Sequence, residues 1–168
     1  MKVAIPIILS LLFWGSTLTV LAQDVPDHEH DGHDHHHEQK NEIGGAIGMV
    51  FNLKEQSTSS GFHLHYMRMF GGKLKRFGVA PGVGFLFGEH HHYSMHVLFS
   101  YRPTHGWWIA AGPGITYFDH ENEWKASGHI ETGYEFDAGK VHFGPVVEFA
   151  WAADDQHIMV GLHLGVPF

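Results

Sequence analysis

The sequence predicts an all-β protein: an eight-stranded antiparallel up-and-down transmembrane β-barrel, preceded by a signal peptide and a disordered His-rich arm. Two observations predict this fold. From Asn41 onward, apolar and polar residues alternate at period two between short polar segments, and no stretch has the 3.6-residue periodicity of a helix. Residues 1–22 form an apolar run of the kind that directs export. We therefore expect a signal peptide over 1–22, the arm over 23–40 and the barrel over 41–168.

The first segment reads MKVAIPIILSLLFWGSTLTVLAQ, in which Lys2 precedes the apolar run and Val20, Leu21 and Ala22 suit a signal peptidase. Cleavage there would start the mature chain near Gln23. No cysteine follows, so we expect neither a lipoprotein anchor nor a disulfide framework. Without Lys2 the chain has 9 basic and 18 acidic residues, a formal charge of −9. Such acidity argues against a nucleic-acid partner, since phosphate binding needs clustered Lys and Arg.

The arm contains the tract DHEHDGHDHHHEQ, residues 27–39, with six histidines and five acidic residues. It is too polar to pack, and His-rich tracts of this composition are typical of metal binding. The alternative is a solvated spacer. The tract follows the predicted cleavage point directly, an unusual place for a purification tag, so we treat it as native. Its predicted metal ligands are His28, His30, His33, His35, His36 and His37.

The barrel region divides into eight short segments of alternating pattern, each bounded by polar or glycine-rich residues. Sequential strands with short connections indicate a meander, and closing it into a barrel removes the exposed edges. The expected strands are 42–53, 60–70, 76–87, 93–102, 107–118, 124–136, 141–152 and 157–168.

The two faces of each expected strand differ in polarity. In HIMVGLHLGVPF, one face carries Ile158, Val160 and Leu162, and the other carries Met159 and His163. Eight strands enclose a space just wide enough for side chains, which the bulky apolar set would overfill. The polar set, with Gly or Ala on the odd strands, fits better. We therefore expect a polar lumen, an apolar wall facing lipid, and aromatic residues near the strand ends at the two membrane interfaces.

An internal repeat places Pro81, Pro113 and Pro145 at an even spacing of 32 residues, in VAPGVGFLF, AAGPGITYF and HFGPVVEFA. The repeating unit is a hairpin. Because proline cannot donate to a strand ladder, we expect a bulge or a bend at each of these positions.

In these features the chain resembles the small eight-stranded outer-membrane β-barrel proteins of the OmpX and OmpA-transmembrane-domain type. The resemblance covers residues 41–168 and rests on the signal peptide, the Gly-Pro-Gly-hydrophobic repeat, and the ending LHLGVPF, whose terminal Phe168 is similar to the family's assembly signal. It implies a porin-like barrel in the outer membrane of a Gram-negative-type envelope, with membrane lipid and the barrel assembly machinery as partners and both termini, including the arm, in the periplasm. The family is not a class of enzymes, so function stays open.

With that topology the external loops would be KEQSTSS, GEHHHYS, DHENEW and ADDQH, and three of them carry both acid and histidine. Imidazole and carboxylate suit Zn²⁺, Cu²⁺ or Ni²⁺. The predicted loop ligands are His90, His91, His92, Asp119, His120 and His157.

Histidine and glutamate also line the predicted lumen. One interpretation is a polar plug in which these side chains satisfy one another, and for any single lumen histidine we prefer it. The lumen residues in question are His63, His65, His96, His129, His142, His163, Glu131, Glu135 and Glu148.

Two functional hypotheses follow. The first is a barrel that binds or buffers divalent Zn, Cu or Ni ions through the arm and the loops; the second is a structural or adhesion barrel with no metal role. The same histidines would also suit a pH sensor. A hydrolase using Ser94, His96 and Glu131 is the weakest idea, because residues two apart on a strand recur by chance and these face the lumen. We therefore predict that the protein is not an enzyme.

Overall fold

The computed structural model describes residues 40–88, 91–153 and 155–168. The predicted signal peptide, the arm up to residue 39, and His90 lie outside the described residues. Among the described residues, no helix is long and apolar enough to cross a membrane.

All eight predicted strands are confirmed, with bounds that differ by at most two residues, and the sixth is interrupted at Glu135. A 3₁₀ turn, Gly72–Leu74, follows the second strand. The strands are β1 (Asn41–Asn52), β2 (Thr58–Met69), β3 (Phe77–Phe87), β4 (His92–Tyr101), β5 (Trp107–Phe118), β6 (Glu123–Tyr134), β7 (Phe136–Ala138), β8 (Val141–Ala152) and β9 (Asp155–Pro167).

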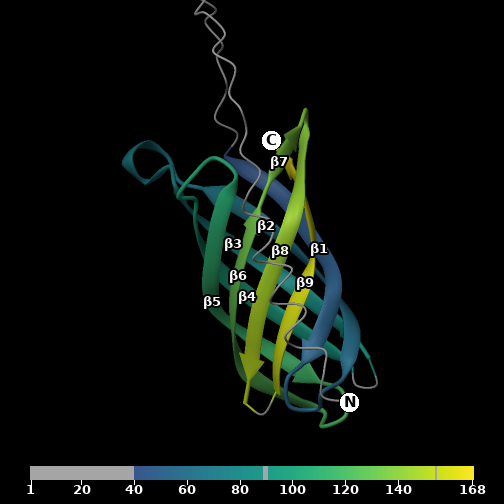
Figure 1. The fold of residues 1–168 in the computed structure, drawn as a ribbon. Coiled ribbons are helices and arrows are strands. Elements are labelled where there is room, and N and C mark those ends of the chain that lie inside the picture. The colour runs from purple at the N-terminus through teal and green to yellow at the C-terminus, as the bar shows by residue number, and fades with distance from the viewer. Residues whose placement is uncertain (1–39, 89–90, 154) are drawn as a thin grey trace, which may run out of the picture. The chain divides into compact units, whose positions relative to one another are not determined.

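The strands form one closed antiparallel barrel (Figure 1). From β1 to β6 each strand pairs with the next, both β6 and β7 pair with β8, β8 pairs with β9, and β1 closes the barrel on β9 from Glu42↔Pro167 to Asn52↔His157. We call the end where β1 begins and β9 stops the base; it is uppermost in Figure 1. The opposite end, where β1 turns into β2 and β8 into β9, is the mouth. The long strands therefore run between base and mouth, and the short β7 lies at the base. Lumen side chains from strands far apart in the sequence can thus lie at the same height along the barrel.

The alternation places apolar side chains on the wall and polar ones in the lumen, as predicted. On β9, Leu162 is 63% exposed, whereas Met159 and His163, on the opposite face of the strand, are 4% and 2% exposed. Large exposed apolar residues recur on the outside of the other strands, for example Ile47 and Phe99. An apolar outside around an ionisable inside is the polarity of a transmembrane barrel.

Aromatic residues gather near both ends of the wall. Towards the mouth, the Tyr117 ring lies 6.3 Å from Tyr93 and 5.3 Å from Trp124. Towards the base, Phe77 lies 4.9 Å from Tyr101 on the neighbouring strand. These positions match the interfacial girdles expected at the two surfaces of a membrane.

The three repeated prolines interrupt the strand ladder without changing its register. Around Pro81, the pairing of β2 with β3 skips two residue pairs between His65↔Gly82 and Arg68↔Val79, yet the partners remain in step. A bulge would add one residue to one strand and shift the register. The bulge alternative is therefore wrong, and the missing proline N–H accounts for the gap. Equivalent gaps lie opposite Pro113 and Pro145.

The gap opposite Pro145 is the reason that the predicted sixth strand divides into β6 and β7. The pairs Gly133↔Val146 and Phe136↔Phe143 keep one register on either side of it. At the break, the backbone N–H of Glu135 donates to the Gly106 carbonyl oxygen at 2.8 Å, which continues the register of β5 with β6. The backbone of this lumen carboxylate near the base is thus held by β5.

Candidate metal sites

Histidine and carboxylate side chains meet at three levels of the lumen. They form a mouth group, a middle group and a base group, and the residues of each group come from at least two strands. The mouth group is His92, Asp155 and His157; the middle group is His63, His129, Glu131 and Glu148; the base group is Glu42, Glu135, His142 and His163.

The mouth group is centred on Asp155. The Nδ1 atoms of His157 and His92 lie 3.1 Å and 3.5 Å from Asp155 Oδ2, and the Asn52 amide donates to Oδ1 at 2.6 Å. The His92 ring also packs 4.4 Å from the Phe118 ring. Two imidazoles from β4 and β9 therefore share one buried carboxylate.

The other predicted loop ligands are not brought into this group. His91, Asp119 and His120 are exposed, and His120 lies beside Glu121, with Nε2 3.4 Å from its carboxylate. The His120 ring remains within 6.3 Å of His92. Of the six predicted loop ligands, the structure brings only His92 and His157 onto one carboxylate, and His90 lies outside the described residues.

The middle group is centred on Glu148, and both of its carboxylate oxygens are engaged. His129 Nδ1 lies 3.0 Å from Oε1 and His63 Nδ1 lies 3.2 Å from Oε2. Glu131 adds a second carboxylate 3.7 Å from His63 Nε2. The adjoining cavity has a volume of about 40 Å³, little more than the space one water needs. Both Glu148 oxygens and the two Nδ1 atoms are thus paired, as in a polar plug, whereas His63 Nε2 and His129 Nε2 lack a hydrogen-bond partner.

The hydrogen bonds that a hydrolase site of Ser94, His96 and Glu131 would need are not present in the part of the chain that the structure describes. No hydrogen bond joins Ser94 to His96 there, and none joins His96 to Glu131. His96 instead packs its ring 4.8 Å from the His129 ring.

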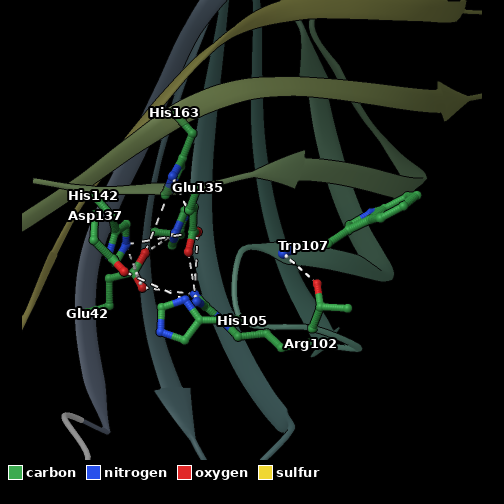
Figure 2. Close-up of polar contacts among 10 residues, drawn as sticks. Glu42, Arg102, His105, Trp107, Glu135, Asp137, His142 and His163 are labelled. Atoms are coloured by element: carbon green, nitrogen blue, oxygen red, sulfur yellow. Dashed lines mark hydrogen bonds and ion pairs between the residues drawn. The ribbon is translucent and has the colours of Figure 1, made fainter. Parts of the chain in front are cut away.

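The base group surrounds two carboxylates (Figure 2). His142 Nε2 lies 3.1 Å from Glu42 Oε2 and 3.9 Å from Glu135 Oε1. His163 lies between the same two residues, 3.7 Å from each carboxylate. All four side chains are buried, and their donor atoms lie within 4.8 Å of one another.

Arg102 joins the two carboxylates of the base group. Its Nη1 donates to Glu135 Oε2 at 2.7 Å and its Nη2 to Glu42 Oε2 at 3.1 Å. The guanidinium charge offsets the repulsion between the two carboxylates.

A cavity of about 520 Å³ opens beside this group at the base of the barrel. Glu42, Glu135, His142 and Arg102 line it, together with Lys40 at the start of the described chain. The base group is thus reached from one end of the barrel, whereas the much smaller cavity beside the middle group is also lined by His92 and His157 of the mouth group.

Sequence reasoning singled out Glu135, His142 and His163 as lumen residues but missed Glu42 and Arg102. The signal was present. Glu42 has the same parity as the inward Gly44 and Ala46, and Arg102 the same parity as the inward His96 and Ser100. Extending the alternation to the strand ends would have placed both at the base.

No family model and no curated protein matches the sequence. Solved structures do match. Neisserial surface protein A has a TM-score of 0.60 at 8% identity, over 76% of this chain and 96% of that one. The N-terminal β-barrel domain of Pseudomonas aeruginosa OprF has a TM-score of 0.56 at 15% identity, over 77% and 98%. Ail of Yersinia pestis, in complex with the heparin analogue sucrose octasulfate, has a TM-score of 0.51 at 17% identity, over 76% and 97%.

At these identities the likeness shows the fold. The described chain has the closed eight-stranded antiparallel barrel of small outer-membrane proteins, consistent with the OmpX-like and OmpA-like resemblance in the sequence. Function has to be argued from the side chains.

Proposed function

We propose that this chain is an outer-membrane β-barrel that binds or buffers divalent transition-metal ions, Zn²⁺, Cu²⁺ or Ni²⁺. Its ligands would be the arm histidines His28–His37 and the mouth residues, with the arm in the periplasm. The observation that carries the proposal is the mouth group, in which His92 and His157 approach Asp155 from two different strands. Neutral imidazole beside carboxylate is a donor set that these ions prefer.

The outer-membrane location is supported by the apolar wall, the aromatic ends and the fold of the matching structures. Membrane lipid and the barrel assembly machinery would then be partners, with Phe168 at the end of the last strand as part of the assembly signal. Because the middle of the lumen is filled by side chains, binding or buffering is favoured over transport through the barrel.

Calorimetric titration with Zn²⁺, Cu²⁺ and Ni²⁺ tests the proposal on the detergent-refolded chain from Gln23. We expect saturable binding of more than one ion per chain. A variant with the six tract histidines, His92 and His157 replaced by Asn should lose most of this capacity. The matched control is His105→Asn, which removes an exposed histidine outside the proposed ligands. Absence of binding by the unmodified chain would contradict the function.

A growth experiment separates this function from a structural or adhesion role. Cells lacking the gene would be complemented with the unmodified chain or with the same Asn variant. We expect the variant to fail specifically under metal excess or metal starvation. Full complementation under both conditions would favour the role without metal.

A further inference from the structure

The base group contains several buried nitrogen and oxygen atoms that have no hydrogen-bond partner. Both ring nitrogens of His163, which is 2% exposed, lack a hydrogen-bond partner, as do His142 Nε2 and Glu42 Oε1. A buried polar atom without a partner costs about 1–3 kcal/mol. Several such atoms at one point are expected where a further group is meant to bind.

The spacing of these atoms suits a small cation. Zn²⁺ takes nitrogen and oxygen ligands at about 2.0–2.2 Å, so tetrahedral donors lie about 3.4 Å apart. One donor atom from each of Glu42, Glu135, His142 and His163 lies within 4.8 Å of the other three. His163 approaches Glu42 through Nε2 and Glu135 through Nδ1, so only one of these two 3.7 Å contacts can belong to a single ion site. His65 Nε2 also lies 3.7 Å from Glu42 Oε1. Small side-chain movements would bring all four donors onto one ion.

Two glycines provide the space for these side chains. A Cβ at Gly44 would lie 2.8 Å from His163 Nε2 and 3.0 Å from Glu42 Oε1. A Cβ at Gly165 would collide with His142 Nε2 and lie 2.7 Å from the same glutamate oxygen. On β1 and β9, glycine therefore leaves a cradle that the donor atoms occupy.

The base cavity gives an ion access to this cradle. An ion entering beside Lys40 meets Glu42, Glu135 and His142 without passing the middle group. Arg102 already spans the two carboxylates, so an entering ion has to compete with the guanidinium for at least one carboxylate oxygen.

We propose that Glu42, Glu135, His142 and His163 form a second site for a divalent transition-metal ion, inside the lumen at the base, separate from the arm and the mouth. The inference rests on the proposed metal-handling function and names a site for it. Two imidazoles and two carboxylates without thiolate are a donor set for Zn²⁺, Cu²⁺ or Ni²⁺. The last histidine of the arm tract is His37, three residues before Lys40 in the sequence.

The test uses the whole chain from Gln23 with the six tract histidines, His92 and His157 changed to Asn, so that the arm tract and the mouth group no longer contribute imidazoles. Zn²⁺ is titrated into this background by calorimetry, and Co²⁺ is added separately to record its ligand-field absorption. The site variants are His142→Asn and the isosteric Glu135→Gln. The matched control is His129→Asn in the middle group. Circular dichroism of each variant reports whether the barrel has folded.

We expect one Zn²⁺ per chain in the background, bound at least about tenfold more weakly in each site variant and unchanged in the control. The Co²⁺ spectrum should change in the site variants alone. Binding that survives both site variants, or that weakens equally in His129→Asn, overturns the base site. Binding by the unmodified chain with none in the background also overturns it while leaving the proposed function intact. Only absence of binding in both chains contradicts the function itself.

Discussion

The middle group and the base group have the same chemistry but different surroundings. Each combines two histidines with two glutamates in the lumen, and all of these side chains are buried. In the middle group, Glu148 uses one carboxylate oxygen for each imidazole, and the adjoining cavity is small. In the base group, His142 Nε2 and both ring nitrogens of His163 lack a hydrogen bond, and His142 lines a cavity of about 520 Å³.

The comparison shows that residue type alone does not separate a structural network from a binding site. The separation depends on whether the donor atoms have satisfied one another and whether an ion can reach them. By this criterion, the middle group stabilises the barrel and the base group is available to bind. Substitutions in the two groups should therefore affect different measurements.

The largest expected effect is on stability, from Glu148→Ala. Removing this carboxylate leaves His63 and His129 buried without their acceptor, and breaking a buried ionic pair costs about 3–5 kcal/mol. Urea-dependent folding in lipid vesicles measures the loss. Zn²⁺ affinity at the base should remain unchanged in the molecules that fold. A loss of less than about 1 kcal/mol in the free energy of unfolding would show that the middle group does not stabilise the barrel.

Much of this arrangement follows from period-two alternation. It correctly assigns Met159 and His163 to the lumen and Leu162 to the wall, because successive side chains on a strand point to opposite faces. The same rule, carried to the strand ends, would have included Glu42 and Arg102. Fold and lumen composition are therefore readable from the sequence.

The pairing within the lumen is not readable in that way. Glu42 on β1 meets His142 on β8, although β9 lies between these strands in the barrel. Such contacts depend on the stagger of the strands and on side-chain conformations across the lumen. The sequence also shows that Pro145 lacks an N–H but not that the ladder would open there without a bulge.

The next effect, on both stability and binding, is expected from Arg102→Gln. Loss of the guanidinium leaves Glu42 and Glu135 without their charged donor, so the metal-free barrel should lose about 2 kcal/mol. Zn²⁺ should bind about tenfold more tightly, equal to about 1.4 kcal/mol, because the ion no longer competes with the guanidinium. Folding titrations with and without Zn²⁺ measure both changes.

The control for this variant is Arg68→Gln, since Arg68 bonds Asn41 outside the base group. It should leave Zn²⁺ affinity unchanged. If Arg102→Gln weakened Zn²⁺ binding, the guanidinium would be supporting the bound state rather than competing with it.

The smallest expected effect comes from Gly165→Ala, which should change Zn²⁺ affinity but hardly change stability. The nearest atoms to a Cβ at Gly165 all belong to the side chains of His142 and Glu42. Because side-chain ends can move, Gly165→Ala should change barrel stability little, but it displaces two proposed ligands. We expect Zn²⁺ affinity in the Asn background to fall about tenfold, about 1.4 kcal/mol.

Gly84→Ala is the matched lumen control, because the atom nearest to its Cβ is Ser94 Oγ and none of the nearest atoms belongs to the base group. It should alter neither stability nor Zn²⁺ binding appreciably. Equal Zn²⁺ affinity in the two alanine variants would mean that the cradle at β9 does not hold the ion. A fall confined to Gly165→Ala would place the bound ion beside His142 and Glu42, since no residue of the middle group lies among the atoms nearest to that Cβ.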